Sequence, residues 1–119
     1  MRTLRNAGPL AAATLSLVAC TTKPPPIARG LPQNFQDARQ AFSERVAARF
    51  PVGSAETDLR AELQREGFDI RPARPDLAPY QFSAIVDHPG VCRLTWVIRW
   101  AAQSNRLTNI AGDYSQTCL

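Results

Sequence analysis

The last third of the chain alternates apolar and polar residues in two segments joined by a short polar turn, and this pattern constrains the fold most. Residues 91–101 and 107–117 show the period of two that is typical of strands with one covered and one solvent-facing side. If the loop Ser104-Asn105-Arg106 is centred on Asn105, residues whose numbers sum to 210 face each other. The sequence therefore predicts an antiparallel hairpin with a defined register.

The same register brings two cysteines together. Cys92 would lie opposite Cys118, and Trp96 opposite Tyr114, so the alignment of the apolar residues also aligns the thiols. A disulfide here would close a loop of about 27 residues, for which the chain-entropy model gives roughly 3 to 4 kcal/mol of stabilisation. The alternative is two free buried thiols. Two cysteines and a single histidine do not form a recognisable zinc pattern, so we expect no metal site.

The two faces of the predicted hairpin differ in character. One face carries Trp96, Trp100 and Tyr114, which we expect the helices to cover. The opposite face carries the residues that we take as a candidate partner surface, namely Arg93, Val97, Arg99 and Asp113. An edge of the sheet could also accept a strand from a partner.

Two helices are predicted before the strands. Residues 34–50 repeat apolar side chains every three to four positions, and Pro51 ends this helix. A second helix is predicted over residues 55–66, with Ser54 as its N-cap and Gly67 just past its end.

The remaining part of the chain completes the expected fold. Residues 71–79 contain three prolines and should form an irregular connection, whereas residues 80–87 alternate like a first strand. The sequence thus predicts a single small α+β domain over residues 33–119. Two N-terminal helices would pack on a three-stranded antiparallel β-meander.

The N-terminus has the pattern of a secretion signal. Two arginines, Arg2 and Arg5, precede a mostly apolar stretch over residues 7–19. This stretch is too short to span a bilayer as a helix, but it has the length of a signal-peptide core. It ends in Leu17-Val18-Ala19-Cys20, which resembles the lipobox of bacterial lipoproteins. The resemblance implies cleavage between Ala19 and Cys20 and acylation of Cys20.

Acylation would explain the odd cysteine count and would define a location. Of the three cysteines, Cys20 would carry lipid and the other two would pair in an oxidising periplasm; an ordinary Cys20 behind a conventional signal is the alternative. More than one acyl chain anchors a protein stably. Because Thr21 and not aspartate follows Cys20, the resemblance to Gram-negative sorting rules implies the outer membrane. Residues 20–32, which include three consecutive prolines, should form an extended spacer.

Charge and motifs exclude several classes of function. The chain has 14 Lys and Arg against 10 Asp and Glu, and two of the arginines lie in the expected signal. The basic residues are scattered among acidic ones, so we expect no nucleic-acid partner. The sequence has no glycine-rich phosphate loop and no nucleophile–base motif, and its one histidine, His88, lies in a turn sequence. We therefore expect no catalytic residue and no cofactor.

The predicted order of two helices and then strands, behind a lipobox, resembles the SmpA/OmlA (BamE-like) group of outer-membrane lipoproteins. It also resembles small proteobacterial lipoproteins in general. The first likeness covers about residues 50–117 and rests on Val52-Gly53-Ser54 leading into Leu59 and on the closing hairpin. It implies a role in β-barrel assembly, although no functional residue is carried over. The sequence thus predicts a lipid-anchored, non-enzymatic accessory or interaction protein of the cell envelope, acting in outer-membrane assembly or maintenance. The alternative is a periplasmic binding module or inhibitor that captures a soluble ligand or enzyme.

Overall fold

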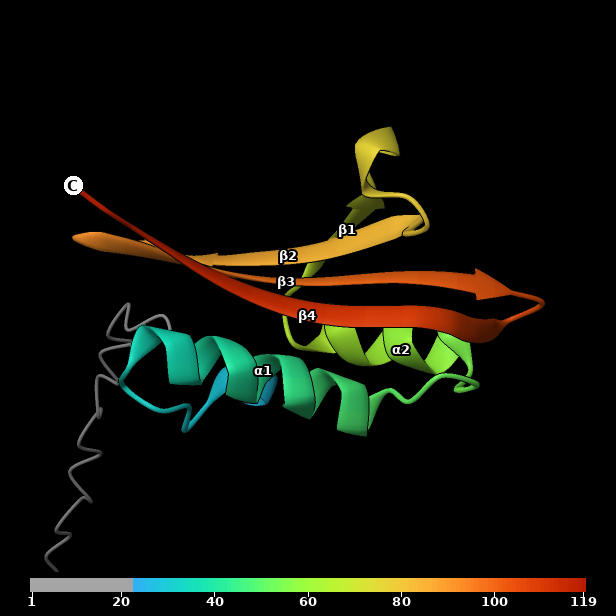
Figure 1. The fold of residues 1–119 in the computed structure, drawn as a ribbon, viewed down its shortest axis with the longest axis horizontal. Helices are drawn as coiled ribbons and strands as arrows, with labels where there is room; N and C mark the ends of the chain where they lie inside the picture. Colours follow the sequence, from blue (N-terminus) through green and yellow to red (C-terminus); the bar gives the residue numbers. More distant parts are fainter. Residues whose placement is uncertain (1–22) are drawn as a thin grey trace, which may run out of the picture.

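The computed structural model describes residues 23–119, so the expected signal sequence, Ala19 and Cys20 lie outside the described residues. Two helices precede a four-stranded antiparallel sheet in the order β1-β2-β3-β4 (Figure 1). Short 3₁₀ turns, η1 and η2, lie before α1 and between β1 and β2. The elements are η1 Pro26–Ala28, α1 Phe35–Arg49, α2 Glu56–Arg65, β1 Asp69–Pro72, η2 Pro75–Leu77, β2 Phe82–His88, β3 Cys92–Gln103 and β4 Arg106–Cys118.

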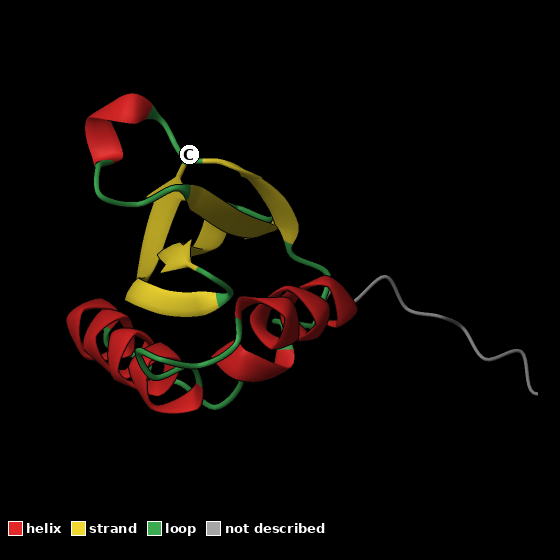
Figure 2. Ribbon diagram, turned by 90° about the vertical axis from the view of Figure 1, so that its right-hand side faces the viewer, coloured by secondary structure: helices red, strands yellow, loops and turns green. Residues whose placement is uncertain are grey.

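The molecule has two layers, with α1 and α2 side by side against one face of the sheet (Figure 2). Side chains from both helices and from the covered face of the sheet form one buried core. The tryptophans are buried in it, as the alternation predicts. Its largest fully buried side chains are Trp100, Phe42, Ile27, Leu59, Leu63, Ile98, Leu107 and Val46.

The sheet has one strand more than the sequence predicts. Strand β1 pairs with β2 along four residues, from Asp69 opposite Ile85 to Pro72 opposite Phe82. The second half of this strand lies in the stretch that we expected to be irregular. Four residues are too few for a clear period of two, and the proline is tolerated because β1 is an edge strand.

The predicted register of the closing hairpin is confirmed over most of its length. Cys92 pairs with Cys118, Trp96 with Tyr114, and the pairing continues unchanged as far as Ala101 opposite Asn109. Beyond that point the register shifts by one residue, because Thr108 is left without a partner in a β-bulge.

The bulge changes the turn that joins β3 to β4. Gln103 pairs with Arg106, so the loop has two residues rather than the three expected. Both of them, Ser104 and Asn105, have positive φ angles of 52° and 62°. Such a turn matches the twist of the two strands, and asparagine adopts this conformation more readily than most residues.

Both helices form where the sequence predicts them, but the expected cap of α2 is wrong. The Ser54 hydroxyl donates to the carbonyl of Pro51 at 2.6 Å instead of capping the helix. Ala55 occupies the N-cap position. The hairpin turn caps α2 instead, because the backbone oxygen of Asn105 accepts from the N–H of Glu56 and its side-chain oxygen accepts from the N–H of Thr57, each at 3.0 Å.

Part of the expected spacer belongs to the folded domain. Ile27 in η1 is only 2% exposed and lies in the core, where its N–H donates to Glu66 Oε1 at 2.8 Å. The Arg45 guanidinium of α1 donates to the carbonyls of Ile27 and Arg29, at 2.9 and 2.6 Å. An extended spacer is therefore wrong for these residues, which the domain holds through two buried apolar side chains, Ile27 and Ala28, and three hydrogen bonds.

Candidate partner surface and edge groove

The structure divides the four residues of the candidate partner surface among three places. Arg93, Val97 and Arg99 alternate along β3 with the buried tryptophans and so lie on the sheet face away from the helices. Asp113 is the partner of Val97 on β4. Arg93 lies four residues from Val97, about 13 Å along the strand, near the cystine. The four residues therefore do not form one continuous patch.

A loop covers the middle of this sheet face. Val97 and Arg99 line a hollow of about 360 Å³ together with Leu77 of η2. Beneath it lies Ser83 of β2, which is only 7% exposed. The connection between β1 and β2 thus covers part of the face that alternation alone assigns to solvent.

Asp113 pairs with helix α1 rather than with the sheet face. Its Oδ1 accepts from Arg39 Nε at 2.8 Å, and both side chains remain substantially exposed. The hydrogen bond from Arg39 to Asp113 and the negative charge of Asp113 raise the pKa of Arg39 above its ordinary value. Oδ1 also accepts from the backbone N–H of Tyr114 at 2.8 Å. Asp113 therefore links the edge of the sheet to α1.

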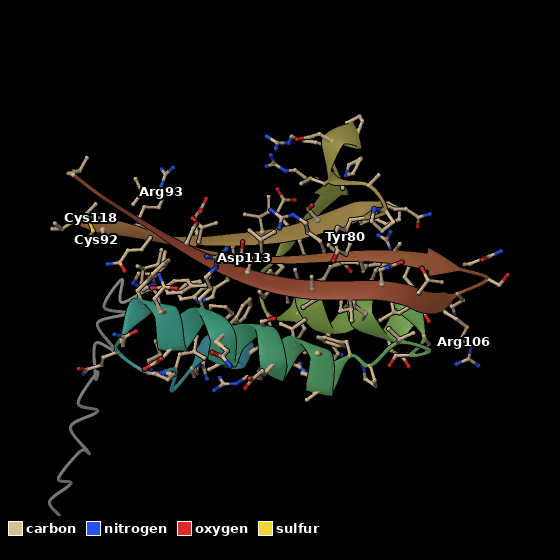
Figure 3. All side chains as sticks on the ribbon, viewed as in Figure 1. Tyr80, Cys92, Arg93, Arg106, Asp113 and Cys118 are labelled. Carbon is tan, nitrogen blue, oxygen red and sulfur yellow. A yellow bond between two sulfur atoms is a disulfide. The ribbon has the colours of Figure 1, made fainter. Side chains whose placement is uncertain are left out.

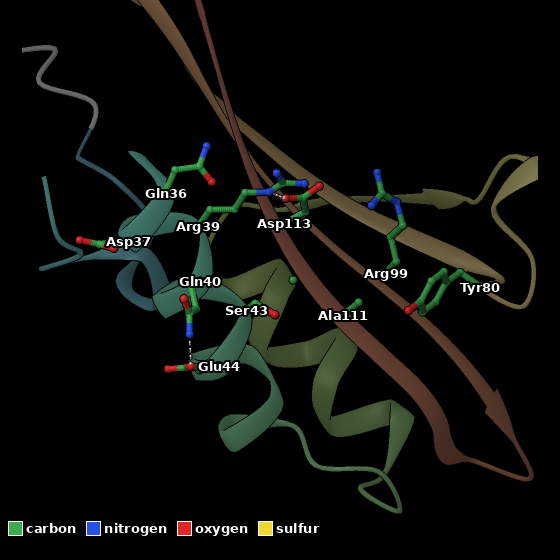
Figure 4. Close-up of a pocket in the computed structure, with 11 residues that line it drawn as sticks. Gln36, Asp37, Arg39, Gln40, Ser43, Glu44, Tyr80, Arg99, Ala111 and Asp113 are labelled. Atoms are coloured by element: carbon green, nitrogen blue, oxygen red, sulfur yellow. Dashed lines mark hydrogen bonds and ion pairs between the residues drawn. The ribbon is translucent and has the colours of Figure 1, made fainter. Parts of the chain in front are cut away.

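A groove of about 700 Å³ runs beside this ion pair, between α1 and the outer face of the sheet (Figure 4). One wall is formed by α1, which contributes Arg39 and a row of polar side chains. The other wall comes from Tyr80 and Arg99, with β4 between the two. The lining residues are Gln36, Asp37, Arg39, Gln40, Ser43, Glu44, Tyr80, Arg99, Ala111, Gly112 and Asp113.

The groove follows an unpaired edge of the sheet. At the start of β4, Leu107 exchanges two backbone hydrogen bonds with Gly53 and Ser54, at 2.8 and 2.9 Å, which cover the edge there. Farther along, within residues 23–119, β4 has a strand neighbour only on its β3 side.

The geometry of the ladder shows which backbone groups point outward. The carbonyl of Trp100 accepts from Gln81 on the β2 side. Trp100 and its β4 partner Ile110 therefore form a non-hydrogen-bonded pair, so Ile110 directs its N–H and C=O away from β3. The same alternation points the backbone groups of Gly112 and Gln116 outward. The outward N–H of Tyr114, which lies between them, already donates to Asp113 Oδ1, so within residues 23–119 the edge offers the groups of Ile110, Gly112 and Gln116 to an added chain.

Sequence reasoning missed the residues of the helix wall and Tyr80. The polar residues Gln36, Arg39, Gln40 and Ser43 recur at the helical spacing of three and four, which is a signal of one polar stripe. A polar stripe on a helix ordinarily faces solvent, and only the packing of α1 beside β4 makes it a wall. The sequence predicts a strand that begins at Tyr80, but β2 begins at Phe82 and Tyr80 lies in the preceding loop.

The cystine closes the far end of the same hairpin. The sulfurs of Cys92 and Cys118 are 2.05 Å apart, so the two cysteines are bonded (Figure 3). Arg93 lies beside them and lines a separate hollow of about 380 Å³ with Val91 and Leu119. His88, expected in a turn, ends β2, and its ring lies edge-on to Trp96 with the ring centroids 6.3 Å apart.

Metal ligation and membrane crossing were both expected to be absent from the folded domain, and the following holds for the described part of the chain. Residues 23–119 hold no group of three or more His, Cys, Asp or Glu side chains placed to bind a metal ion. No helix among them has the length and apolar character needed to cross a membrane. Comparisons of the chain with protein families, with curated proteins and with solved structures find no match.

Proposed function

We propose that this chain is a lipid-anchored, non-enzymatic interaction protein of the bacterial cell envelope that binds an extended segment of a partner protein along the free edge of β4. The observation that carries the proposal is the edge groove, in which outward-pointing backbone groups of β4 lie between two polar walls. A segment added there would gain main-chain hydrogen bonds from the edge and side-chain selectivity from the walls.

The position of Gly112 favours such an addition. Its outward side is free, while its inner side meets α1 so closely that a Cβ atom would lie 2.6 Å from Val46 Cγ2. The side chains of Val46 and Phe42 therefore pack directly on the backbone of Gly112 on the covered face, while its N–H and C=O point away from β3 in the plane of the sheet. A buried apolar cleft is not required for this mode of binding, because the hydrogen bonds of the backbone supply much of the affinity.

Arg99 is the cation of the groove that a carboxylate of the bound segment would meet, whereas Asp37 and Glu44 on the helix wall would meet neutral or basic side chains. Arg39 is already paired with Asp113, but Arg99 has no salt bridge within the described residues, and its buried Nε has no hydrogen-bond partner there. A carboxylate placed beside Arg99 would supply a partner for that donor. Tyr80, on the same wall, offers an aromatic face and a hydroxyl.

The anchor and the location rest on the sequence. The lipobox-like run that ends at Cys20 supports acylation, and Thr21 supports the outer membrane over retention on the inner one. The resemblance of the sequence to the SmpA/OmlA group is the basis on which we propose assembly or maintenance of the outer membrane as the process served.

Photo-crosslinking in cells tests the groove. When a photo-crosslinking residue replaces Gln40 on the helix wall of the acylated protein, it should form a crosslink to an outer-membrane protein. The same residue in place of Gln64, exposed on α2, is the matched control. In the purified complex, the amides of Gly112 and Gln116 should gain protection from hydrogen exchange. Equal capture at both positions, or no added protection of the two amides, would contradict binding at the edge.

A second experiment tests the anchor separately. Cys20→Ser should move the protein from the membrane fraction to the soluble periplasmic fraction, because the acyl chains can no longer attach. Persistence of this variant in the membrane fraction would overturn the lipid anchor.

The second candidate function is a periplasmic binding module or inhibitor for a soluble ligand or enzyme. The volume of the edge groove, about 700 Å³, falls in the range of ligand sites. Recovery of the same soluble partner by the acylated form and by Cys20→Ser would favour this candidate over the first.

A further inference from the structure

Exposed apolar side chains gather at the cystine end of the sheet. In the described part of the chain, three large hydrophobic residues are exposed: Val52, Val91 and Leu119. Val91 is 79% exposed and Leu119 is fully exposed, and the two are neighbours because the N–H of Leu119 donates to the carbonyl of Val91 at 3.2 Å. Val52 lies at the opposite end, beside Gly53, whose carbonyl accepts from Arg106.

The apolar pair is held in place by covalent structure. Val91 and Leu119 flank the disulfide between Cys92 and Cys118, so the ends of β3 and β4 cannot separate there. Together with Pro89, Gly90 and Thr117 they surround Arg93, which has the only charged side chain lining this hollow. The end of the sheet therefore presents a fixed apolar surface with one cation, which we call the cystine tip and define by residues 89–93 and 117–119.

The N-terminal segment approaches the domain from the same end. Pro24 lines a hollow with Trp96 and Tyr114, which lie four residues from Cys92 and Cys118. Figure 1 shows the start of α1 near this end of the sheet, and Figure 3 shows Arg106 at the other end. Three residues lie between Cys20 and Pro24, and a stretch of that length reaches at most about 14 Å.

Because the segment around Ile27 packs on the domain, the connection between the expected lipid and the domain is short, whereas the sequence predicts a long spacer. Had all of residues 20–32 been extended, the lipid would have been able to lie tens of ångströms away in any direction. Because Ile27 is fixed in the core, the reach of the attachment point is set by the short stretch before Pro24, which starts from the half of the sheet that carries the cystine. The hairpin turn at the far end lies about 36 Å away along β3.

We infer that the cystine tip is a membrane-contact site, in which Val91 and Leu119 enter the interfacial region of a phospholipid bilayer and Arg93 meets the lipid phosphates. The inference rests on the acylation of Cys20 in the proposed function. Two aliphatic side chains alone bind a bilayer weakly, but the anchor holds them at a high effective concentration beside it. The contact would orient the domain with α2's N-terminus and the hairpin turn pointing away from the membrane.

Paramagnetic relaxation measured by NMR tests this orientation. The isotope-labelled, acylated full-length protein is placed in nanodiscs of phosphatidylethanolamine and phosphatidylglycerol that carry a gadolinium-chelating headgroup lipid. We expect the amide signals of residues 90–93 and 117–119 to relax several-fold faster than those of residues 52–53 and 104–106. Equal relaxation at both ends, or faster relaxation at residues 52–53, would overturn the inference.

Matched variants separate contact from anchoring. The double variant Val91→Ser/Leu119→Ser should show a smaller relaxation enhancement at the cystine tip. The control variant Val52→Ser should leave that enhancement unchanged. An unchanged enhancement in the double variant would overturn the role of the two side chains. Retention of the disulfide and of the dispersed amide spectrum shows that the double variant is folded. Co-elution of the protein with the nanodiscs reports on the acyl anchor alone, so loss of the anchor is distinguished from loss of the contact.

Discussion

The side-chain oxygen of Asn105 accepts a hydrogen bond from the backbone N–H of Thr57 at 3.0 Å, although the two residues lie 48 positions apart. The tip of the β3–β4 hairpin thereby supplies the cap of α2, and the backbone oxygen of the same asparagine accepts from the preceding N–H, that of Glu56. One residue thus closes a turn and begins a helix. This end of the helical layer is joined to the sheet by hydrogen bonds as well as by apolar contact.

Replacing Asn105 separates its two roles. Asn105→Gly keeps the positive φ of 62° but removes the cap, and should lower the free energy of unfolding by about 1 kcal/mol. Asn105→Asp keeps an acceptor and places a negative charge at the helix N-terminus, so it should cost less. Urea denaturation measures both values. If the aspartate variant loses as much stability as the glycine variant, the side chain does not act as a cap.

Gly112 is expected to be intolerant of even one methyl group. A Cβ atom at this position would lie 2.6 Å from Val46 Cγ2 and 3.2 Å from Phe42 Cε2, both on α1. Gly112→Ala should therefore lower the free energy of unfolding by about 1 to 3 kcal/mol. The double variant Gly112→Ala/Val46→Ala should partly relieve the clash. A double-mutant cycle of the free energies of unfolding should therefore show a favourable coupling between the two positions. Additive losses would mean that the helix moves without strain.

The cystine is expected to contribute a large part of the stability. Cys92→Ser should lower the free energy of unfolding by roughly 3 to 4 kcal/mol, because the unfolded chain loses a closed loop of about 27 residues. Cys118→Ser should have the same effect, and the double variant should cost no more than either single one. Peptide mapping under non-reducing conditions should recover residues 92 and 118 as one linked species; free thiols in periplasmic protein would contradict the disulfide.

Acid should weaken the ion pairs that join α1 to α2. Hydrogen bonds from Arg65 and then from Arg49 lower the pKa of Glu62 below its ordinary value of 4.5. A lowered pKa in the folded state means that the stabilisation is present above pH 4.5 and is lost as the pH falls through the folded-state pKa. Glu62→Gln should therefore flatten part of the decline in melting temperature below pH 4.5, and Arg65→Gln should flatten it less. A decline identical to that of the unchanged protein would exclude Glu62 as a contributor.

The features that local pattern determines were predictable from the sequence. The alternation of β3 and β4 indicates both the covered face and the register that pairs Cys92 with Cys118, because a slip of one residue would bury the polar set. Gly67 also ends α2 as its position predicts: its φ is +92°, and the N–H of Phe68 donates back to the carbonyl of Leu63 at 2.9 Å.

The features that depend on contacts distant in sequence were not predictable. Ser54 has the residue type and position of a cap, yet Asn105 fills that role from another element. Residues 24–30 have the proline-rich composition of a spacer. Nothing in that local sequence shows that Arg45 and Glu66, which are distant in the chain, bind its backbone. Likewise, Arg39 and Tyr80 come from segments 41 residues apart, and only packing places them around one groove.

The burial of Ile27 has a practical consequence for where this domain can be cut or joined. A chain shortened to residues 33–119, which the prolines suggest as a natural boundary, would lose a fully buried core side chain and leave Arg45 and Glu66 without their backbone partners. The smallest portable unit therefore begins at about Pro24. A fusion that preserves residues 24–30 keeps a complete interior, whereas a fusion that replaces them opens a cavity between the two helices.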